Sequence, residues 1–85
     1  MIYEYYLHFE YNVPRNLDPF LDSHFDSWHQ VLNTSFALQS EKPLASVYTL
    51  LRDRCLSNSF CLIQSKGYRP FESYDHVPLP SEQDE

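Results

Sequence analysis

The sequence predicts an α+β domain in which two helices cover one face of a four-stranded antiparallel sheet. Three observations support this prediction: strict alternation in the first twelve residues, apolar residues at helical spacing in two later segments, and short strand-like runs around those segments. The predicted order along the chain is strand, helix, strand, strand, helix, strand. This βαββαβ order is the split βαβ, or ferredoxin-like, pattern, and it predicts a central first strand.

The first strand is predicted over Ile2–Val13, where apolar residues occupy the odd positions. Successive side chains of a strand point to opposite sides, so the odd residues should face the helices and the even residues should be exposed. The exposed side would carry Ile2, Tyr6 and His8. We expect these residues to bind a partner, most simply a second copy of the chain in a homodimer.

The first helix is predicted over residues 18–26, with Asp18 as its N-cap. A longer helix that continues to residue 33 is an alternative, because apolar residues keep helical spacing up to that point. We favour two short strands near residues 28–32 and 35–39. Turn-forming residues interrupt the segment between them: Asn33, Thr34 and Ser35.

The second helix is predicted to start with Pro43 in its first turn and to close at Asn58 in a left-handed conformation. Its apolar face consists of residues at helical spacing: Leu44, Val47, Tyr48, Leu51 and Cys55. Phe60–Gln64 follows as a buried strand. The second helix and this strand would complete the sheet and its cover.

The end of the chain is predicted to leave the domain. Lys66 and Gly67 should form a tight turn, and Tyr68–Tyr74 could extend or return along the sheet edge. We expect one domain over residues 1–71. Residues 72–85 hold five acids and no Lys or Arg, which is typical of an acidic, flexible tail.

Charge is unevenly distributed along the chain, whose net charge is −6. Residues 1–41 and 72–85 are acidic, whereas residues 42–71 carry most of the cations. Net acidity argues against strong nonspecific binding of nucleic acid, although the basic segment could contact a single strand by charge and stacking. The residues concerned are Arg52, Arg54, Lys66, Tyr68 and Arg69, and a solvated surface is the alternative.

No segment has the length of apolar residues that a membrane span needs, and no signal peptide is visible, so we expect a cytoplasmic protein without membrane contact. Cys55 and Cys61 are expected to stay reduced. His24 and His29 lie five residues apart, which does not bring two side chains together on a helix. We therefore predict no metal site and no cofactor.

The element order and three segments resemble the dimeric ferredoxin-like family of the CRISPR adaptation nuclease subunit and the VapD-type toxins. The likeness covers roughly residues 3–65, and its segments are Phe9–Val13, Trp28–Leu38 and Leu44–Ile63. The resemblance implies a homodimer that pairs through its sheets. For some members it also implies cleavage of RNA or DNA with a divalent metal.

The matching position for the family's metal-binding aspartate, after a tyrosine at the end of the first strand, is Asn12. An amide lacks the negative charge that Mg²⁺ takes from a carboxylate. We therefore expect a non-enzymatic protein that binds another protein. A small regulator or inhibitor fits, such as a phage- or plasmid-borne anti-defence protein of the anti-CRISPR type. The alternative is a Mg²⁺- or Mn²⁺-dependent endonuclease that uses Glu10, Asn12 and Asp18.

Overall fold

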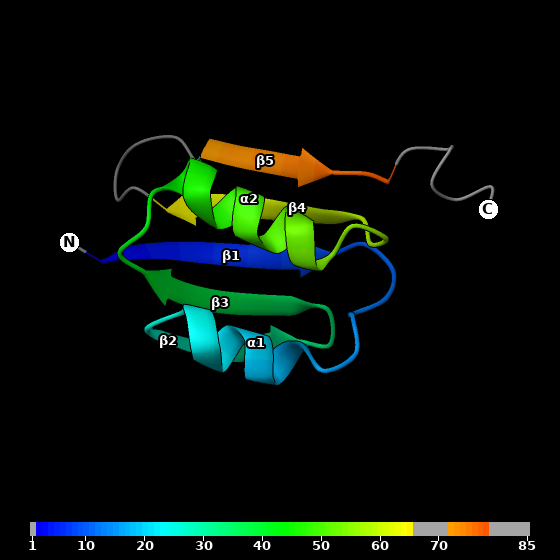
Figure 1. Ribbon diagram of the computed structural model, residues 1–85, viewed down its shortest axis with the longest axis horizontal. Helices are drawn as coiled ribbons and strands as arrows, with labels where there is room; N and C mark the ends of the chain where they lie inside the picture. Colours follow the sequence, from blue (N-terminus) through cyan, green and yellow to red (C-terminus); the bar gives the residue numbers. More distant parts are fainter. Residues whose placement is uncertain (1, 66–71, 79–85) are drawn as a thin grey trace.

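The strands form one antiparallel sheet in the order β2-β3-β1-β4-β5, and both helices lie on the same side of it (Figure 1). The computed structural model describes residues 2–65 and 72–78. The elements in chain order are β1 Tyr3–Phe9, α1 Leu17–His24, β2 Ser27–Leu32, β3 Ser35–Ser40, α2 Leu44–Arg54, β4 Phe60–Ser65 and β5 Glu72–His76. The predicted α+β class and the two helices are confirmed, but the sheet has five strands instead of four.

β1 occupies the centre of the sheet, as predicted, and pairs with β3 on one side and β4 on the other. Tyr5 lies opposite Leu38 of β3 and Gln64 of β4. The strand is shorter than expected, because its last partners are Ser35 and Phe60 and no strand continues beside the residues that follow Phe9. The predicted extension to Val13 is therefore wrong.

The core lies between the helices and the odd-numbered face of β1. Tyr5, Leu7 and Phe9 are fully buried. The helices contribute buried leucines and a valine to the same cluster: Leu17, Leu21, Leu44, Val47 and Leu51. The even residues Glu4 and His8 are exposed. The alternation in the sequence therefore identified the buried face of β1 correctly. The helices cover one side of the sheet, so only the residues that face the helices are removed from water.

The first helix begins at Leu17, one residue before the predicted N-cap. Asn16 is the N-cap, with φ 58° and ψ 33° in the left-handed region, and no side chain caps the helix. Asp18 lies in the first turn, where a carboxylate suits the positive end of the helix dipole. The helix ends at His24 because Phe25 is extended, so the alternative of a longer helix is wrong.

Replacing Asn16 by alanine is expected to lower the free energy of unfolding by about 1 kcal/mol, because a Cβ without a local polar group disfavours the left-handed conformation. Asn16→Gly should leave stability unchanged or slightly higher, since glycine adopts positive φ without strain. Urea unfolding of both variants measures the difference. An equal loss in the two variants would show that the side chain, and not the backbone angle, matters at this position.

The second helix also begins and ends inside its predicted limits. Pro43 is its N-cap and Cys55 its C-cap. Asn58 does not close the helix, because among the described non-glycine residues only Asn16 has a positive φ. The Asn58 backbone N–H donates to the Cys55 carbonyl oxygen at 3.0 Å, and its side-chain amide donates to the Asn12 carbonyl oxygen at 2.9 Å. Asn58 therefore joins the end of the helix to the chain that leaves β1.

The additional strand β5 starts where we expected the acidic tail. It pairs antiparallel with β4, with Tyr74 opposite Leu62 and His76 opposite Phe60. Aromatic packing holds it to α2, since the rings of Tyr48 and Tyr74 lie edge to face at 5.0 Å. The predicted turn at 66–67 and the remainder of the predicted tail, residues 79–85, lie outside the described residues. No helix in the described ranges is long and apolar enough to cross a membrane.

Candidate functional site

The side of the sheet away from the helices is its open face, because none of the described helices covers it (Figure 1). Residues paired across an antiparallel sheet share a face, so the register of the strands identifies its members. They are Glu4, Tyr6 and His8 of β1, Ser27 and His29 of β2, Ser35, Ala37 and Gln39 of β3, Cys61, Ile63 and Ser65 of β4 and Ser73 and Asp75 of β5. This face contains two of the predicted binding residues, Tyr6 and His8.

The centre of the open face is apolar. Tyr6 lies opposite Ala37 on one side and Ile63 on the other, and its side chain is 40% exposed. Ile2, the third residue predicted on this strand face, is also exposed and precedes β1. Ala37 is buried at 5% exposure and Ile63 is half-buried, so the exposed apolar groups here are chiefly Tyr6 and Ile2. Exposed apolar groups that lie close together are typical of surfaces that bind other proteins.

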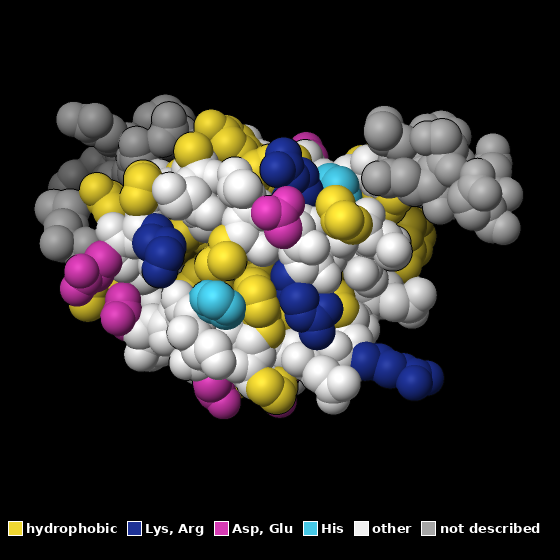
Figure 2. Space-filling view, in the orientation of Figure 1, with side chains coloured by type: hydrophobic (Ala, Val, Ile, Leu, Met, Phe, Trp, Pro, Cys, Tyr) yellow, Lys and Arg dark blue, Asp and Glu magenta, His cyan; other side chains and the backbone are white. Residues whose placement is uncertain are grey.

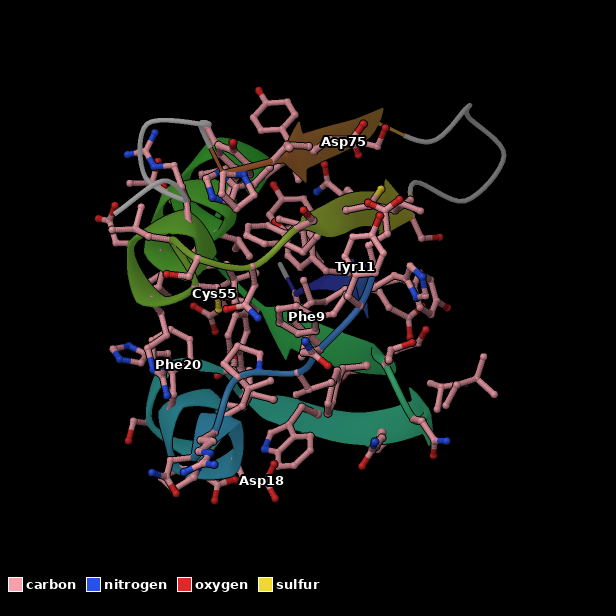
Figure 3. All side chains as sticks on the ribbon, turned by 90° about the vertical axis from the view of Figure 1, so that its right-hand side faces the viewer. Phe9, Tyr11, Asp18, Phe20, Cys55 and Asp75 are labelled. Atoms are coloured by element: carbon pink, nitrogen blue, oxygen red, sulfur yellow. The ribbon has the colours of Figure 1, made fainter. Side chains whose placement is uncertain are left out.

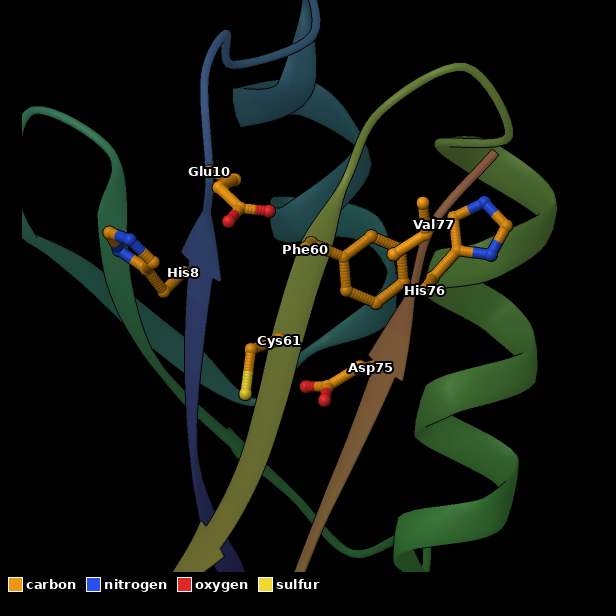
Figure 4. A pocket seen from close by; sticks show the side chains of 7 residues that line it. All are labelled: His8, Glu10, Phe60, Cys61, Asp75, His76 and Val77. Atoms are coloured by element: carbon orange, nitrogen blue, oxygen red, sulfur yellow. The ribbon is translucent and has the colours of Figure 1, made fainter. Parts of the chain in front are cut away.

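A cavity of about 240 Å³ opens at one end of this face, where β1, β4 and β5 lie side by side (Figure 4). Its lining combines polar and apolar side chains: His8, Glu10, Phe60, Cys61, Asp75, His76 and Val77. His8 Nδ1 is hydrogen-bonded to Ser35 Oγ at 2.8 Å. His76 Nε2 lies 3.1 Å from the Leu56 carbonyl oxygen. Both histidines are thus held by neighbouring protein groups.

The Cys61 thiol inside this cavity is held in its protonated form near neutral pH. Burial raises the pKa of the Cys61 thiol to about 11, and the Asp75 carboxylate adds to this by accepting the thiol hydrogen bond and by its negative charge. Reactive cysteines instead need a lowered pKa, because the thiolate is the attacking species. Cys55, the C-cap of α2, is buried, and burial likewise raises the pKa of its thiol to about 11. The arrangement therefore supports no thiol chemistry near neutral pH.

Asp75→Asn is expected to accelerate alkylation of Cys61 by iodoacetamide several-fold at pH 8.5, because loss of the carboxylate lowers the thiol pKa and increases the thiolate fraction. Peptide mapping by mass spectrometry separates Cys61 from Cys55, whose rate serves as the internal control. In the unchanged protein the Cys61 rate should rise until the pH approaches 11. A plateau near pH 9, or no effect of Asp75→Asn, contradicts this assignment.

The residues predicted for a nuclease lie on different elements. Glu10 follows β1 and lines the cavity, whereas Asp18 is exposed in the first turn of α1. Figure 3 shows Tyr11, the neighbour of Glu10 and Asn12, well separated from Asp18. Across residues 2–65 and 72–78, no three His, Cys, Asp or Glu side chains lie close enough together to hold a metal ion.

The predicted basic binding residues divide into two groups. Lys66, Tyr68 and Arg69 lie outside the described residues. Arg54 is engaged in the fold, because its Nη2 donates to the carbonyl oxygens of Arg15 at 2.8 Å and Asn16 at 3.3 Å. Arg52 lies 3.5 Å from the Asp53 carboxylate, and both side chains are solvent-exposed. Neither arginine lies on the open face, since both belong to α2.

Several members of the open face were absent from the sequence prediction: Ala37, Cys61, Ile63 and Asp75. Alternation within β4 could have identified two of them. Leu62 faces the core, so its neighbours Cys61 and Ile63 must lie on the opposite face of the strand. Asp75 could not be found in this way, since its strand was assigned in part to the tail.

Comparison with protein families, with curated proteins and with solved structures finds no match for this chain.

Proposed function

We propose that this chain is a non-enzymatic protein that binds another protein through the open face of its sheet. The observation that carries the proposal is the apolar centre, where Tyr6 lies between Ala37 and Ile63 on a face that no described helix covers. We further infer that β1 to β4 and the two helices form a ferredoxin-like unit, to which β5 is added. A small regulator or inhibitor is the role that suits a single binding surface on a domain of this size.

Combining Tyr6→Ala with Ile63→Ser tests this proposal. The variant should remain folded, because Tyr6 is already 40% exposed, but should lose retention of the native partner from an extract of the source cells. Tyr11→Ala is the matched control, since it also removes an exposed tyrosine ring but lies off the strand. Equal retention by all three proteins, each with unchanged circular dichroism, would place the binding surface elsewhere.

The endonuclease alternative is tested by incubating the protein with RNA and with duplex DNA in Mg²⁺ or Mn²⁺. We expect no cleavage, because Asn12 supplies no charge to a cation. Among the described residues, neither Glu10 nor Asp18 belongs to a group of three acidic, histidine or cysteine side chains that could hold a metal ion. Cleavage that Glu10→Ala abolishes would replace the binding proposal by the nuclease one. Cleavage that Glu10→Ala leaves unchanged would indicate a contaminating enzyme.

A homodimer remains the proposed oligomeric state, and the β2 edge is the surface that suits it best. β2 ends the sheet order, and Ser27–Leu32 contains no Lys or Pro, the residues that commonly protect an edge strand. Two copies could therefore pair β2 with β2 and extend the sheet. Sedimentation equilibrium should give twice the chain mass of 10.2 kDa, and a single-chain mass at high concentration contradicts this proposal.

A further inference from the structure

The Asp, Glu, Lys and Arg residues described on and beside the open face share one sign of charge. The described residues of these four types, on this face and at the cavity at its end, are all acidic: Glu4 on β1, Glu10 at the cavity and Asp75 on β5. The described cations lie elsewhere, since Arg15 and Lys42 belong to the connections before the helices and Arg52 and Arg54 to α2. Figure 2 shows Lys and Arg side chains distributed over the helix-covered side. The helix-covered side thus carries charges of both signs, with Asp18 and Asp22 on α1 and Asp53 on α2 beside the arginines, whereas the described Lys and Arg residues are absent from the open face.

We propose that the occupant of the open face is a protein surface in which Lys and Arg side chains surround an apolar centre. This inference rests on the proposed function and names the chemical class of the partner. Tyr6 and Ile63 would contact the apolar groups of that partner. The carboxylates around them would pair with its cations, and such complementarity speeds association and excludes wrongly charged partners.

Other occupants fit this charge less well. A second copy stacked face to face would bring the same three carboxylates and none of the described Lys or Arg side chains to pair with them. Like charges held close together in an interface oppose association. Nucleic acid meets the same obstacle, because its affinity depends on neutralising phosphates with cations. The proposed pairing of two copies at the β2 edge remains compatible with a basic partner on the open face.

Two other polar residues of the open face, His8 and Gln39, are held by neighbouring protein groups. His8 Nδ1 is hydrogen-bonded to Ser35 Oγ at 2.8 Å. Gln39 carries no charge and accepts a hydrogen bond from Ser27 Oγ at 2.6 Å. Apart from the histidines His8 and His29, the described charged side chains of this face are therefore carboxylates.

The test is an NMR titration of the ¹⁵N-labelled protein with three probes: a hexapeptide of alternating Arg and Leu, one of alternating Glu and Leu, and a single-stranded oligonucleotide. We expect the Arg-Leu peptide alone to shift amides of the open face, including those of Tyr6, Ala37 and Ile63. The affinity should fall as salt is added, because screening weakens exposed charge pairs.

The charge requirement is tested by combining Glu4→Gln, Glu10→Gln and Asp75→Asn, which should weaken binding of the Arg-Leu peptide about tenfold. The matched control removes three exposed carboxylates outside the strands, by Asp18→Asn, Asp26→Asn and Glu41→Gln. It should change the affinity by less than about twofold. Equal weakening in both variants would mean that net charge alone attracts the peptide, and would overturn the inference.

The probes also separate this inference from the proposed function. If the Glu-Leu peptide or the oligonucleotide shifts the open face as strongly, the partner class is wrong although the surface is correct. If all shifts fall on the helices or connections, the proposed surface itself is wrong. Only shifts confined to the open face, produced by the Arg-Leu peptide and weakened by the three open-face substitutions, support both.

Discussion

Replacing Phe9 by alanine is expected to lower the free energy of unfolding by about 3–5 kcal/mol, because removal of a large buried ring leaves a cavity in the core. Phe9 is fully buried at the end of β1. Its ring lies 6.2 Å from that of Phe36 and 6.0 Å from that of Phe60, both in edge-to-face geometry. Removing the ring leaves a cavity that joins three strands, and the strands cannot close it without breaking their pairing.

Tyr11→Ala is the matched control, because Tyr11 lies two positions along the chain but is 74% exposed (Figure 3). Its unfolding free energy should stay within about 0.5 kcal/mol of the unchanged protein. Urea unfolding followed by circular dichroism measures both. A domain of this size has a total stability of only about 5–10 kcal/mol, so Phe9→Ala should unfold partly near body temperature. A loss below about 1 kcal/mol would show that the core collapses around the missing ring.

The contrast between these two residues shows how far the alternating pattern could be used. Alternation gave the correct face for Tyr5, Leu7 and Phe9, because period-two patterning is decided by which side meets the helices. It could not give the end of the strand. That end depends on where β3 and β4 begin, at Ser35 and Phe60, and these partners are distant in sequence.

Local propensity was similarly incomplete at helix ends. Asp18 is a favourable N-cap by residue type, yet the helix starts one residue earlier, where Asn16 takes the left-handed conformation. Asparagine tolerates that conformation, so both solutions were open to the sequence. The choice fits the burial of Leu17, which is 3% exposed and joins the core as the first helical residue.

The sequence predicted only part of the candidate site, because it shows alternation within a strand but not which distant strands pair. Tyr6 and His8 follow from alternation within one strand, but their neighbours Ile63 and Cys61 come from a strand more than fifty positions away. β5 was predicted only in part: the possible edge segment Tyr68–Tyr74 overlaps its first residues, but the acidic residues at the end of the chain led us to assign residues 72–85 to a tail. What fixes that strand is tertiary: the Tyr48 hydroxyl donates to the Asp75 carbonyl oxygen at 3.2 Å, and Tyr74 packs against the Tyr48 ring.

The shared sign of charge on the open face became visible only in three dimensions. Along the chain, the acids of residues 1–41 are spread over strand, helix and connections, and they show no common surface. The sheet brings Glu4, Glu10 and Asp75 to one face, although Asp75 comes from the opposite end of the chain. The basic segment, meanwhile, contributes its described arginines to the helix-covered side. The net charge alone therefore concealed the asymmetry.

Arg54→Ala is expected to lower the free energy of unfolding by about 1–3 kcal/mol, a large effect for a side chain at the surface. Its guanidinium donates to the carbonyl oxygens of Arg15 and Asn16 and lies 5.7 Å from the centre of the Phe20 ring. These contacts join α2 to the turn that begins α1. Hydrogen exchange should therefore show faster exchange of the α1 amides in the variant.

Arg52→Ala is the matched control, since it removes an arginine two positions earlier in the same helix. Arg52 pairs at 3.5 Å with its exposed neighbour Asp53, and such surface pairs contribute less than about 1 kcal/mol. Arg54→Lys should restore only part of the stability, because a compact ammonium group replaces the planar guanidinium that lies over the Phe20 ring. If the two alanine variants lose equal stability and α1 exchange is unchanged, Arg54 does not tie the helices together. It would then be available for the nucleic-acid contact that the basic segment could make.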